Sequence, residues 1–361
     1  THCISSAASD VYKRQIETHM CGEPFRILTS GLPKRIPGKS LLEKRNYLQN
    51  NYDFIRNTLM REPRGHYDMF GGYLLDPVDE KIDADASVIF VNPDGYTDQC
   101  GHGIIALVTT LIQQGWVDKS KYTLKPNLMK IVLETTVGAI ETHACWNGSK
   151  VEYVEFKNTP VYILYKEVQV QTSIGLLTGD IVFNGAFNFF TEVAENILRI
   201  ESQNAMKLMS LGAEVKKKIQ SMKSLDIRSK DFPQIKGLHG VDFINVYNKE
   251  NISDNVSHNQ KSCLVLGVKQ IDRSPCGSGT AGRTGLLYLK NRFNGKSWFI
   301  NESIIGSSLK SRVVETGIKA NGGDYDACVV AIQGTANLLG SSNWNIDLND
   351  KIGTYGFIIP H

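Results

Sequence analysis

Gln99–Ala106 reads QCGHGIIA, and Pro275–Gly282 reads PCGSGTAG. Each stretch follows a β-like apolar run and a short polar loop, and each opens a segment with helical periodicity. The pattern occurs once in each half of the chain. We therefore expect two similar halves, each a strand-rich set with one buried helix that a Cys-Gly pair begins.

Length, composition and charge limit the class of protein. The chain has 361 residues, of which 41% are hydrophobic and 21% are charged, and this suits two globular domains of ordinary size. The formal net charge of +3 is too small to favour nucleic acid or an anionic membrane. Lys216–Lys218 is the one basic run and indicates an exposed helix face. No apolar stretch reaches the roughly 18 residues of a membrane span. We expect a small-molecule substrate, no nucleic-acid or membrane partner, and leave a homodimer open.

The cysteines indicate a reducing compartment. Seven cysteines are scattered along the chain without a CxxC pair or zinc-finger spacing. A long chain with unclustered cysteines and no secretory apolar region is typical of a cytoplasmic protein with reduced thiols. Residues 1–15 lack an initiator Met, are rich in Ser and Ala, and show no periodic pattern. We expect them to be a non-native or disordered tail.

Periodicity predicts the elements around the two cysteines. Ser40 with Glu43 forms a capping-box pattern before a long helix that ends at Met60. The segment Ile104–Ile112 is apolar on nearly every face, so we expect a buried helix there. The further expected strands are Phe25–Thr29, Met69–Leu75, Ala86–Val91, Val241–Val246 and Cys263–Val268, and the further expected helices are Glu192–Met209, Glu214–Met222 and Thr280–Lys290.

A thiol at the start of a helix suits acid/base chemistry. An ordinary thiol has a pKa of about 8.5, and the positive end of a helix dipole lowers it. Glycines next to the thiol let backbone N–H groups approach a ligand, so the helix start is also a carboxylate site. Two such sites facing one cavity would hold Cys100 and Cys276 on opposite sides of an amino acid's α-carbon. This arrangement is typical of a cofactor-independent racemase.

Three other interpretations compete with this one. A single buried cysteine is usually an inert core residue, and Cys145, Cys263 and Cys328 keep that interpretation. Gly277–Gly282 fits G-x-G-x-x-G, with Glu302 as an acidic ribose ligand, but six residues separate it from its strand, whereas the first glycine of a dinucleotide fold follows its strand directly. A zinc site is conceivable with the ligands Cys100, His102, Asp272 and Cys276, although no spacing favours it.

The sequence resembles the proline racemase family, which includes hydroxyproline 2-epimerases and trans-3-hydroxy-L-proline dehydratases. The resemblance covers nearly all of Ile16–Pro360, and the two cysteine blocks in combination are specific to the family. The stretches that carry it are Gly22–Ile27, Glu62–Gly71, Cys100–Gly103, Asp272–Gly279 and Glu302–Ser307.

The resemblance implies a fold and its boundaries. The fold is α/β (α+β) and diaminopimelate epimerase-like, with two pseudo-symmetric domains, each a curved sheet around a central helix, and with the site in the cleft between them. We expect residues 16–156 with about 336–361 to form the first domain, and residues 157–335 to form the second.

The resemblance also implies the site residues. Cys100 and Cys276 would be the two acid/base residues, with no pyridoxal phosphate and no metal. His102 and Asp272 would meet the substrate amine, and Phe70 would wall the ring. The residues implied to bind the carboxylate are Gly101, Gly277 and Ser278.

Departures from the family pattern bear on the substrate. Leu266 stands at a position that is often aromatic in proline racemases, which leaves room for a hydroxylated ring. Cys21 replaces a residue that is usually small, and Asn184-Gly185 replaces a Gly-Gly bend. The dehydratase branch usually carries Thr where this chain has Cys276. We therefore expect racemisation or 2-epimerisation of proline or a hydroxyproline. The alternatives are a trans-3-hydroxy-L-proline dehydratase and an inactive amino-acid-binding paralogue.

Overall fold

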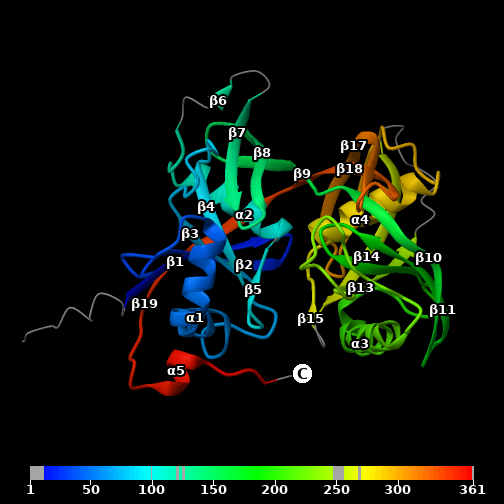
Figure 1. Cartoon of the computed structure of the whole chain (residues 1–361), viewed down its shortest axis with the longest axis horizontal. Helices are drawn as coiled ribbons and strands as arrows, with labels where there is room; N and C mark the ends of the chain where they lie inside the picture. The colour runs from blue at the N-terminus through cyan, green and yellow to red at the C-terminus, as the bar shows by residue number, and fades with distance from the viewer. Residues whose placement is uncertain are drawn as a thin grey trace, which may run out of the picture. The chain divides into compact units, whose positions relative to one another are not determined.

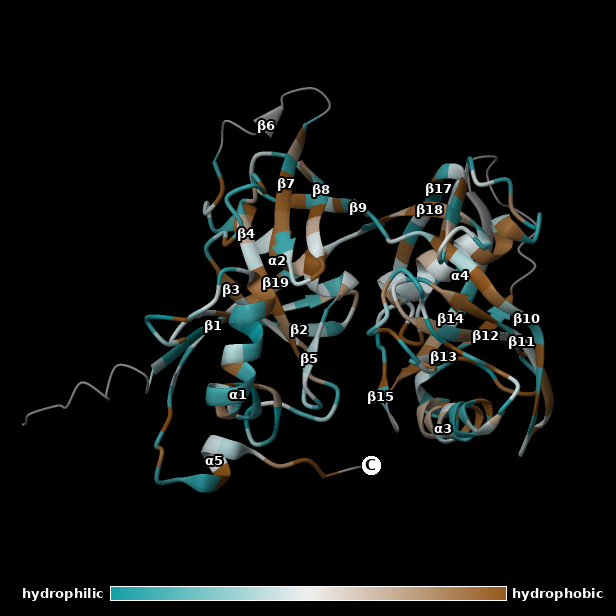
Figure 2. Ribbon diagram, viewed as in Figure 1, coloured by the Kyte–Doolittle hydropathy of each residue, from teal (hydrophilic) through white to brown (hydrophobic). Residues whose placement is uncertain are grey.

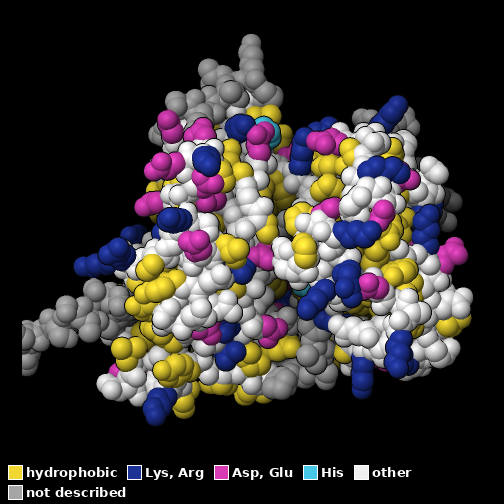
Figure 3. All heavy atoms as spheres, viewed as in Figure 1, with side chains coloured by type: hydrophobic (Ala, Val, Ile, Leu, Met, Phe, Trp, Pro, Cys, Tyr) yellow, Lys and Arg dark blue, Asp and Glu magenta, His cyan; other side chains and the backbone are white. Residues whose placement is uncertain are grey.

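The computed structural model describes residues 12–98, 100–118, 122–123, 127–246, 256–266 and 270–359. The chain divides into two compact units (Figure 1), one formed by Thr1–Val154 with Thr335–His361 and the other by Glu155–Gly334. Strand β9 (Val151–Lys157) crosses the first boundary. Within the described residues, no helix is both long and apolar enough to cross a membrane. Figure 3 shows Lys, Arg, Asp and Glu side chains interspersed over the face drawn, in keeping with the small net charge.

The first unit is built on one mixed sheet. Strands β2–β3 and β4–β7 pair in parallel, and the other neighbours are antiparallel. Short strand β5 (Tyr96–Thr97) pairs antiparallel with β4, and short strand β6 (Tyr122–Thr123) pairs antiparallel with β7. The order across the sheet is β19 (Ala336–Asn345), β1 (Tyr12–Met20), β2 (Glu23–Ser30), β3 (Gly71–Leu75), β4 (Ala86–Val91), β7 (Leu128–Thr135) and β8 (Gly138–Trp146).

The prediction that residues 1–15 form a tail outside the fold is wrong for the last four of them. Tyr12–Gln15 belongs to β1, which lies between β19 and β2. Lys13 and Gln15 are fully buried, and the Lys13 ammonium donates to the Gly31 carbonyl. Because the buried positions Lys13, Gln15 and Thr18 are polar, the period-two pattern that marks a half-buried strand is absent from the sequence. The rest of the expected tail, residues 1–11, lies outside the described residues.

Helix α2 (Gly101–Gln113) is the central element of the first unit. Every residue from His102 to Ile112 is buried, and the helix contacts β1, β2, β8 and β19. The predicted buried helix at Ile104–Ile112 is therefore confirmed. A helix that is apolar on all faces is stable only where the sheet covers it on several sides.

Helix α1 (Leu41–Met60) begins at the predicted cap. The Ser40 side chain accepts from the Glu43 N–H at 3.2 Å. In a capping box the Glu43 carboxylate would accept from the N–H of Ser40. Here Glu43 Oε2 accepts instead from the N–H of the preceding residue, Lys39, at 2.7 Å. Buried Leu41, Leu48, Ile55 and Leu59 form the inner side of α1, which also contacts α5 (Lys351–Tyr355).

The second unit is a closed ring of strands around helix α4 (Gly277–Leu289). The helix contacts β10, β11, β17 and β18, and Thr280–Leu287 is buried throughout. Short strand β15 (Gln270–Ile271) pairs with β14 just before the helix. Around the ring, each strand pairs with the next and the last returns to the first: β10 (Val161–Thr172), β11 (Gly175–Phe183), β12 (Phe187–Glu192), β13 (Gly240–Val246), β14 (Val256–Leu266), β16 (Trp298–Glu302), β17 (Ser308–Ala320) and β18 (Tyr325–Gly334).

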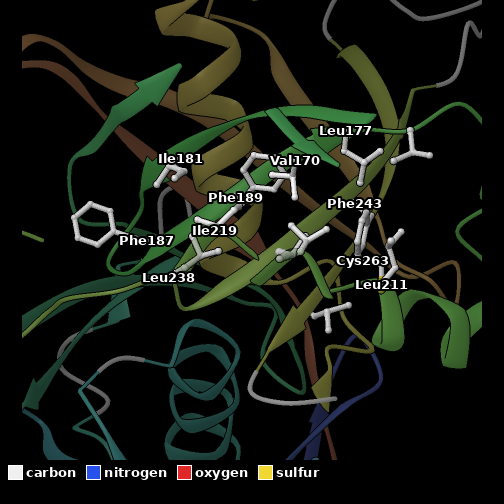
Figure 4. Packing of buried hydrophobic residues seen from close by; sticks show 14 of the residues in the cluster. Val170, Leu177, Ile181, Phe187, Phe189, Leu211, Ile219, Leu238, Phe243 and Cys263 are labelled. Carbon is white, nitrogen blue, oxygen red and sulfur yellow. The ribbon is translucent and has the colours of Figure 1, made fainter. Parts of the chain in front are cut away.

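One helix packs outside the ring where we expected two. Helix α3 (Ala205–Ser221) follows a short 3-10 turn (Ser202–Asn204), and residues 193–201 are not helical. The predicted gap between two helices, from residue 210 to residue 213, is absent, because α3 continues through it. Gly212 in this stretch lets α3 approach β14 closely: a Cβ there would lie 2.6 Å from Val265. Figure 2 shows hydrophilic and hydrophobic residues on different sides of α3. Its apolar side joins the core in Figure 4, with Leu211 and Ile219 near Phe243 and Leu238.

Candidate functional site: two cysteine half-sites

Cys100 is the N-cap residue of α2. Its backbone is extended, with φ −152° and ψ 96°, and its side chain makes no cap hydrogen bond. The residue is 6% exposed. Gly101 is the first residue of the helix, so its N–H is one of the first-turn donors that have no partner within a helix. A buried thiol thus lies beside a group of backbone donors.

His102 lies against this thiol. The distances from Cys100 Sγ to Nδ1 and Nε2 of His102 are 3.6 and 3.5 Å. The imidazole also meets the Phe25 and Phe70 rings edge-on, with centroid distances of 5.7 and 4.9 Å. Burial among these rings lowers the pKa of His102 to about 3, so the imidazole is neutral at physiological pH. It can exchange a hydrogen bond with the thiol without carrying a charge.

Gly103 allows Phe25 to lie directly beneath the first turn of α2. A Cβ at this position would lie 2.5 Å from Phe25 Cε2 and 3.0 Å from Cys100 Sγ. Real side chains do not accept contacts this short against a fully buried ring. The glycine therefore fixes an apolar floor under the thiol.

Cys276 is the N-cap residue of α4 and has a strained backbone. Its φ of 57° lies in the left-handed region, which a non-glycine residue adopts at a cost of about 1–3 kcal/mol. Neighbouring bonds hold this conformation: the Cys276 N–H donates to Ser274 Oγ at 3.1 Å, and Asn301 Nδ2 donates to the Pro275 carbonyl at 3.2 Å. The backbone of Cys100 shows no such strain.

The Cys276 thiol is harder to ionise than the helix position alone predicts. Burial raises the pKa of Cys276 well above its ordinary value, and the charge of Asp272 raises it further. The Gly279 N–H donates to Sγ at 3.2 Å, and the Ser278 hydroxyl lies 3.5 Å from Sγ; both lower the pKa. The expected lowering by the helix start is thus present but is outweighed by desolvation.

Asp272 is placed by the loop that precedes α4. Its N–H donates to the Leu264 carbonyl at 3.0 Å, and its Oδ1 accepts from the N–H and hydroxyl of Ser274 at 2.8 and 2.7 Å. Its side chain is almost fully buried. Because Ser274 also accepts from the Cys276 N–H, one serine ties the carboxylate to the cysteine backbone.

The structure groups the predicted residues into two sets. In the first unit Phe70, Gly101 and His102 adjoin Cys100. In the second unit Asp272, Gly277 and Ser278 adjoin Cys276. Sequence reasoning missed the supporting residues Phe25 and Asn301, and it noted Asn184 only as a departure from the family pattern. Asn184 Nδ2 donates to the Ser278 carbonyl at 2.8 Å, so this departure supports the second half-site.

The glycine pattern at Gly277–Gly282 has a packing role in the ring. A Cβ at Gly282 would lie 2.6 Å from Phe190 and 2.7 Å from Asn184, so this glycine lets α4 pack tightly inside the strands. In the part of the chain that the structure describes, no group of three or more His, Cys, Asp or Glu side chains is arranged to hold a metal ion.

Solved structures with the same architecture show the fold to which this chain belongs. A hydroxyproline epimerase from Agrobacterium vitis, solved with bound trans-4-hydroxy-L-proline, aligns with a TM-score of 0.80 at 24% identity over 96% of each chain. A PhzF-family phenazine biosynthesis protein from Bacillus anthracis aligns with a TM-score of 0.59 at 12% identity, covering 93% of this chain and 99% of that one. The expected two-domain epimerase-like fold is therefore confirmed.

Sequence comparison gives the family. The model of the proline racemase family matches residues 15–357, and the chain belongs to this family of enzymes. A trans-3-hydroxy-L-proline dehydratase from Burkholderia cenocepacia is 38% identical, and a 3-hydroxyproline 2-epimerase from Burkholderia multivorans is 37% identical. A proline racemase from Acetoanaerobium sticklandii is 31% identical. Each alignment covers 95% of this chain and 97% of the relative.

Proposed function

We propose that the protein is a 2-epimerase or racemase of a hydroxyproline or proline that uses Cys100 and Cys276 as its two acid/base residues. The observation that carries the proposal is that each unit has a nearly buried thiol at the N-cap of its central helix, with a glycine next to it. Such a pair of thiols matches a reaction that needs one proton acceptor and one proton donor.

The proposed step balances one proton on each side of the α-carbon. One cysteine, as thiolate, removes the α-proton and becomes a thiol, while the electron pair moves toward the substrate carboxylate. The other cysteine, as thiol, gives its proton to the opposite face and becomes a thiolate. Backbone donors at Gly101 and Gly277, with the Ser278 hydroxyl, stabilise the carboxylate as charge develops on it. The reverse reaction exchanges the two roles.

The substrate amine is proposed to meet one residue from each unit. Asp272 is an almost fully buried carboxylate that can accept from a cyclic ammonium. His102 is neutral and can accept at one ring nitrogen. Phe70 lies edge-on to His102 and is proposed to wall the substrate ring. The proposed reaction needs no pyridoxal phosphate, nicotinamide or metal, since protein thiols do the proton transfer.

Dehydration is the second candidate, and sequence similarity favours it. Relatives that are 38% identical are trans-3-hydroxy-L-proline dehydratases. In that reaction a thiolate removes the α-proton, the C3–O bond breaks, and the hydroxyl leaves as water with a proton from an acid. One base suffices, and Cys276 would then serve as the acid. The first candidate is preferred because a second buried thiol gives the proton return that epimerisation requires.

Proton NMR of the purified protein separates the two candidates. L-proline, trans-4-hydroxy-L-proline and trans-3-hydroxy-L-proline are incubated separately with the protein. In heavy water, epimerisation of a hydroxyproline gives a diastereomer with its ring hydroxyl intact, and racemisation of L-proline removes its α-proton signal. Dehydration of trans-3-hydroxy-L-proline removes the signal of the proton on C3, the carbon that bears the hydroxyl. An inactive paralogue leaves all three substrates unchanged, while their line widths or the protein's melting temperature still report binding.

Assembly and location belong to the same proposal. The free cysteines among the described residues, with no disulfide between them, suit a reducing cytoplasm. A homodimer is the proposed assembly. Light scattering of the full chain tests it: a mass near the 40.2 kDa of a single chain would contradict it.

A further inference from the structure

Asp242 is a buried carboxyl group that the proposed reaction does not use. It lies on β13 and is 0% exposed. The neighbouring residues Val241 and Phe243 point into the apolar core outside the ring. Because side chains alternate along a strand, Asp242 points the other way, toward α4.

The carboxyl group of Asp242 lies beneath the first turn of α4, next to the thiol. A Cβ at Gly279 would lie 3.1 Å from Asp242 Oδ2, 3.3 Å from Cys276 Sγ and 3.0 Å from Cys276 Cβ. The oxygen and the sulfur are therefore no farther apart than the sum of the first two distances. Two negative charges at that separation in a buried site repel each other strongly.

The first unit has an apolar ring in the corresponding place. Gly103 stands three residues after Cys100, as Gly279 stands three residues after Cys276. The group beneath Gly103 is the Phe25 ring, and the group beneath Gly279 is the carboxyl group of Asp242. The two half-sites therefore differ in the charge that each can place beside its thiol.

The ionisable groups around Asp242 come from three elements. Arg283 on α4 lowers the pKa of Asp242, Asp272 before α4 raises it, and the backbone of Cys263 on the paired strand β14 lowers it through a hydrogen bond. The charge of Asp242 in turn raises the pKa of the Cys263 thiol. Arg283 is itself engaged, since it donates to Glu192 and to Gln260. Burial is the largest effect and raises the pKa of Asp242 to about 8. Asp242 therefore loses its proton above about pH 8, and the pKa of Cys276 is raised well above its ordinary value, so Asp242 is charged where Cys276 begins to ionise.

We propose that Asp242 is a positioning residue for the reaction: once Asp242 has lost its proton, its charge opposes ionisation of the Cys276 thiol and favours the protonated, proton-donating form of Cys276. The catalytic part of this inference rests on the proposed function. The electrostatic part, a coupling between Asp242 and Cys276, does not. The two groups titrate as a pair in which the loss of one proton makes the loss of the second harder.

Alkylation of Cys276 as a function of pH tests the coupling without any need for activity. The full chain carries Cys100→Ser, and iodoacetamide modification of the Cys276 peptide is followed by mass spectrometry. Asp242→Asn and Asp242→Val both remove the charge, and Val also removes any hydrogen bond to sulfur. Both variants should move the alkylation profile to lower pH. At pH 9 the rate should rise at least about threefold, as a shift of half a pH unit gives.

The matched control is Asp180→Asn. Asp180 is also a buried carboxylate of the second unit, but it pairs with Lys290 at the other end of α4, 2.6 Å away. Its loss should leave the alkylation profile of Cys276 unchanged. Asp242→Asn and Asp242→Val are both made so that the test survives misfolding of one of them. The melting temperature of each variant at pH 8 shows whether it is folded.

The outcomes are distinct. An unchanged profile in a folded Asp242→Asn or Asp242→Val variant, or a shift to higher pH, would overturn the inference. An equal shift in Asp180→Asn would also overturn it, because the effect would then be general. With both cysteines present, Asp242→Asn should move the alkaline limb of the activity profile to lower pH. A protein without racemase activity but with the alkylation shift would contradict the proposed function and leave the coupling intact.

Discussion

Cys100 and Cys276 occupy the same position in two helices, but their neighbours differ in charge. A neutral imidazole and an apolar ring adjoin Cys100, whereas Asp272 and a hydroxyl adjoin Cys276. Both thiols are buried. At Cys276, burial and the nearby Asp272 carboxylate both raise the pKa and so favour the protonated thiol. A pair in which one thiol keeps its proton is ready to transfer one to a substrate in a single step.

The thiols themselves are the subject of the first prediction. Cys100→Ser and Cys276→Ser should each lower complete racemisation by at least about a hundredfold, because a serine hydroxyl is a far weaker acid and base at neutral pH. Chiral chromatography of the product measures this. The control is Cys145→Ser, which changes a half-buried cysteine on β8 and should retain activity. Near-normal racemisation in either site variant would contradict the two-base proposal.

The second prediction concerns the charge of His102. Its folded-state pKa of about 3 lies below the ordinary value, so the folded protein binds its proton only at strongly acidic pH. Stability from this residue is present above about pH 6.5 and is lost as the pH falls toward 3. Two-dimensional NMR of the ring nitrogens should show no titration of His102 between pH 5 and 8. An inflection near 6.5 would mean that the imidazole is solvated and charged.

At the scale of elements, the two Cys-Gly helix starts were predictable and their surroundings were not. Helix α2 extends the predicted Ile104–Ile112 to Gly101–Gln113, and α4 begins at Gly277 rather than at the expected Thr280. A continuous apolar run carries that information for α2, because a helix that is buried on all sides is apolar on nearly every face. The left-handed backbone of Cys276 depends on bonds from Ser274 and Asn301, which are long-range contacts or side-chain choices that no local pattern encodes.

The third prediction concerns Gly103 and Gly279, the glycines in the first turns of α2 and α4. Gly103→Ala would place a methyl group 2.5 Å from a buried Phe25 ring, so the free energy of unfolding should fall by about 1–3 kcal/mol. Gly279→Ala meets its nearest atoms at 3.0 and 3.1 Å and should destabilise less. Urea unfolding measures both. Gly95→Ala is the control, since a Cβ there has nothing within 4 Å. Equal stability of Gly103→Ala and Gly95→Ala would contradict the packing described for α2.

At the scale of the whole molecule, the chain ends were the hardest part to predict. Strand β1 pairs with β19 from Tyr12↔Asn345 to Met20↔Ala336, so the first unit is made from both ends of the chain. Polar residues at buried positions of β1 removed the alternation of apolar and polar residues that predicts a strand. Pairing between segments more than three hundred residues apart leaves no local sequence pattern. The second unit is continuous, and its ring of strands closes on itself.

This difference between the units gives the fourth prediction. A fragment of residues 155–334 should fold alone, because every strand of its ring and both helices that pack on it lie within the fragment. A fragment of residues 1–154 lacks β19 and should not unfold cooperatively. Circular dichroism melting curves of the two fragments provide the test. A cooperative transition in the first-unit fragment, or none in the second-unit fragment, would contradict the two-unit description.

The central claim is that two cysteines transfer protons on opposite faces of one carbon, and isotope exchange in heavy water tests it most directly. A hydroxyproline, whose 2-epimer is a diastereomer with its own spectrum, is incubated in heavy water, and proton NMR follows the α-position during the first few per cent of reaction. For proline, whose product is the enantiomer, chiral chromatography with mass spectrometry replaces NMR. The proposal predicts a product with inverted configuration and α-deuterium, while unreacted substrate keeps its α-proton. An inverted product that keeps the original α-proton would mean that a single base carries it across, and would contradict the account.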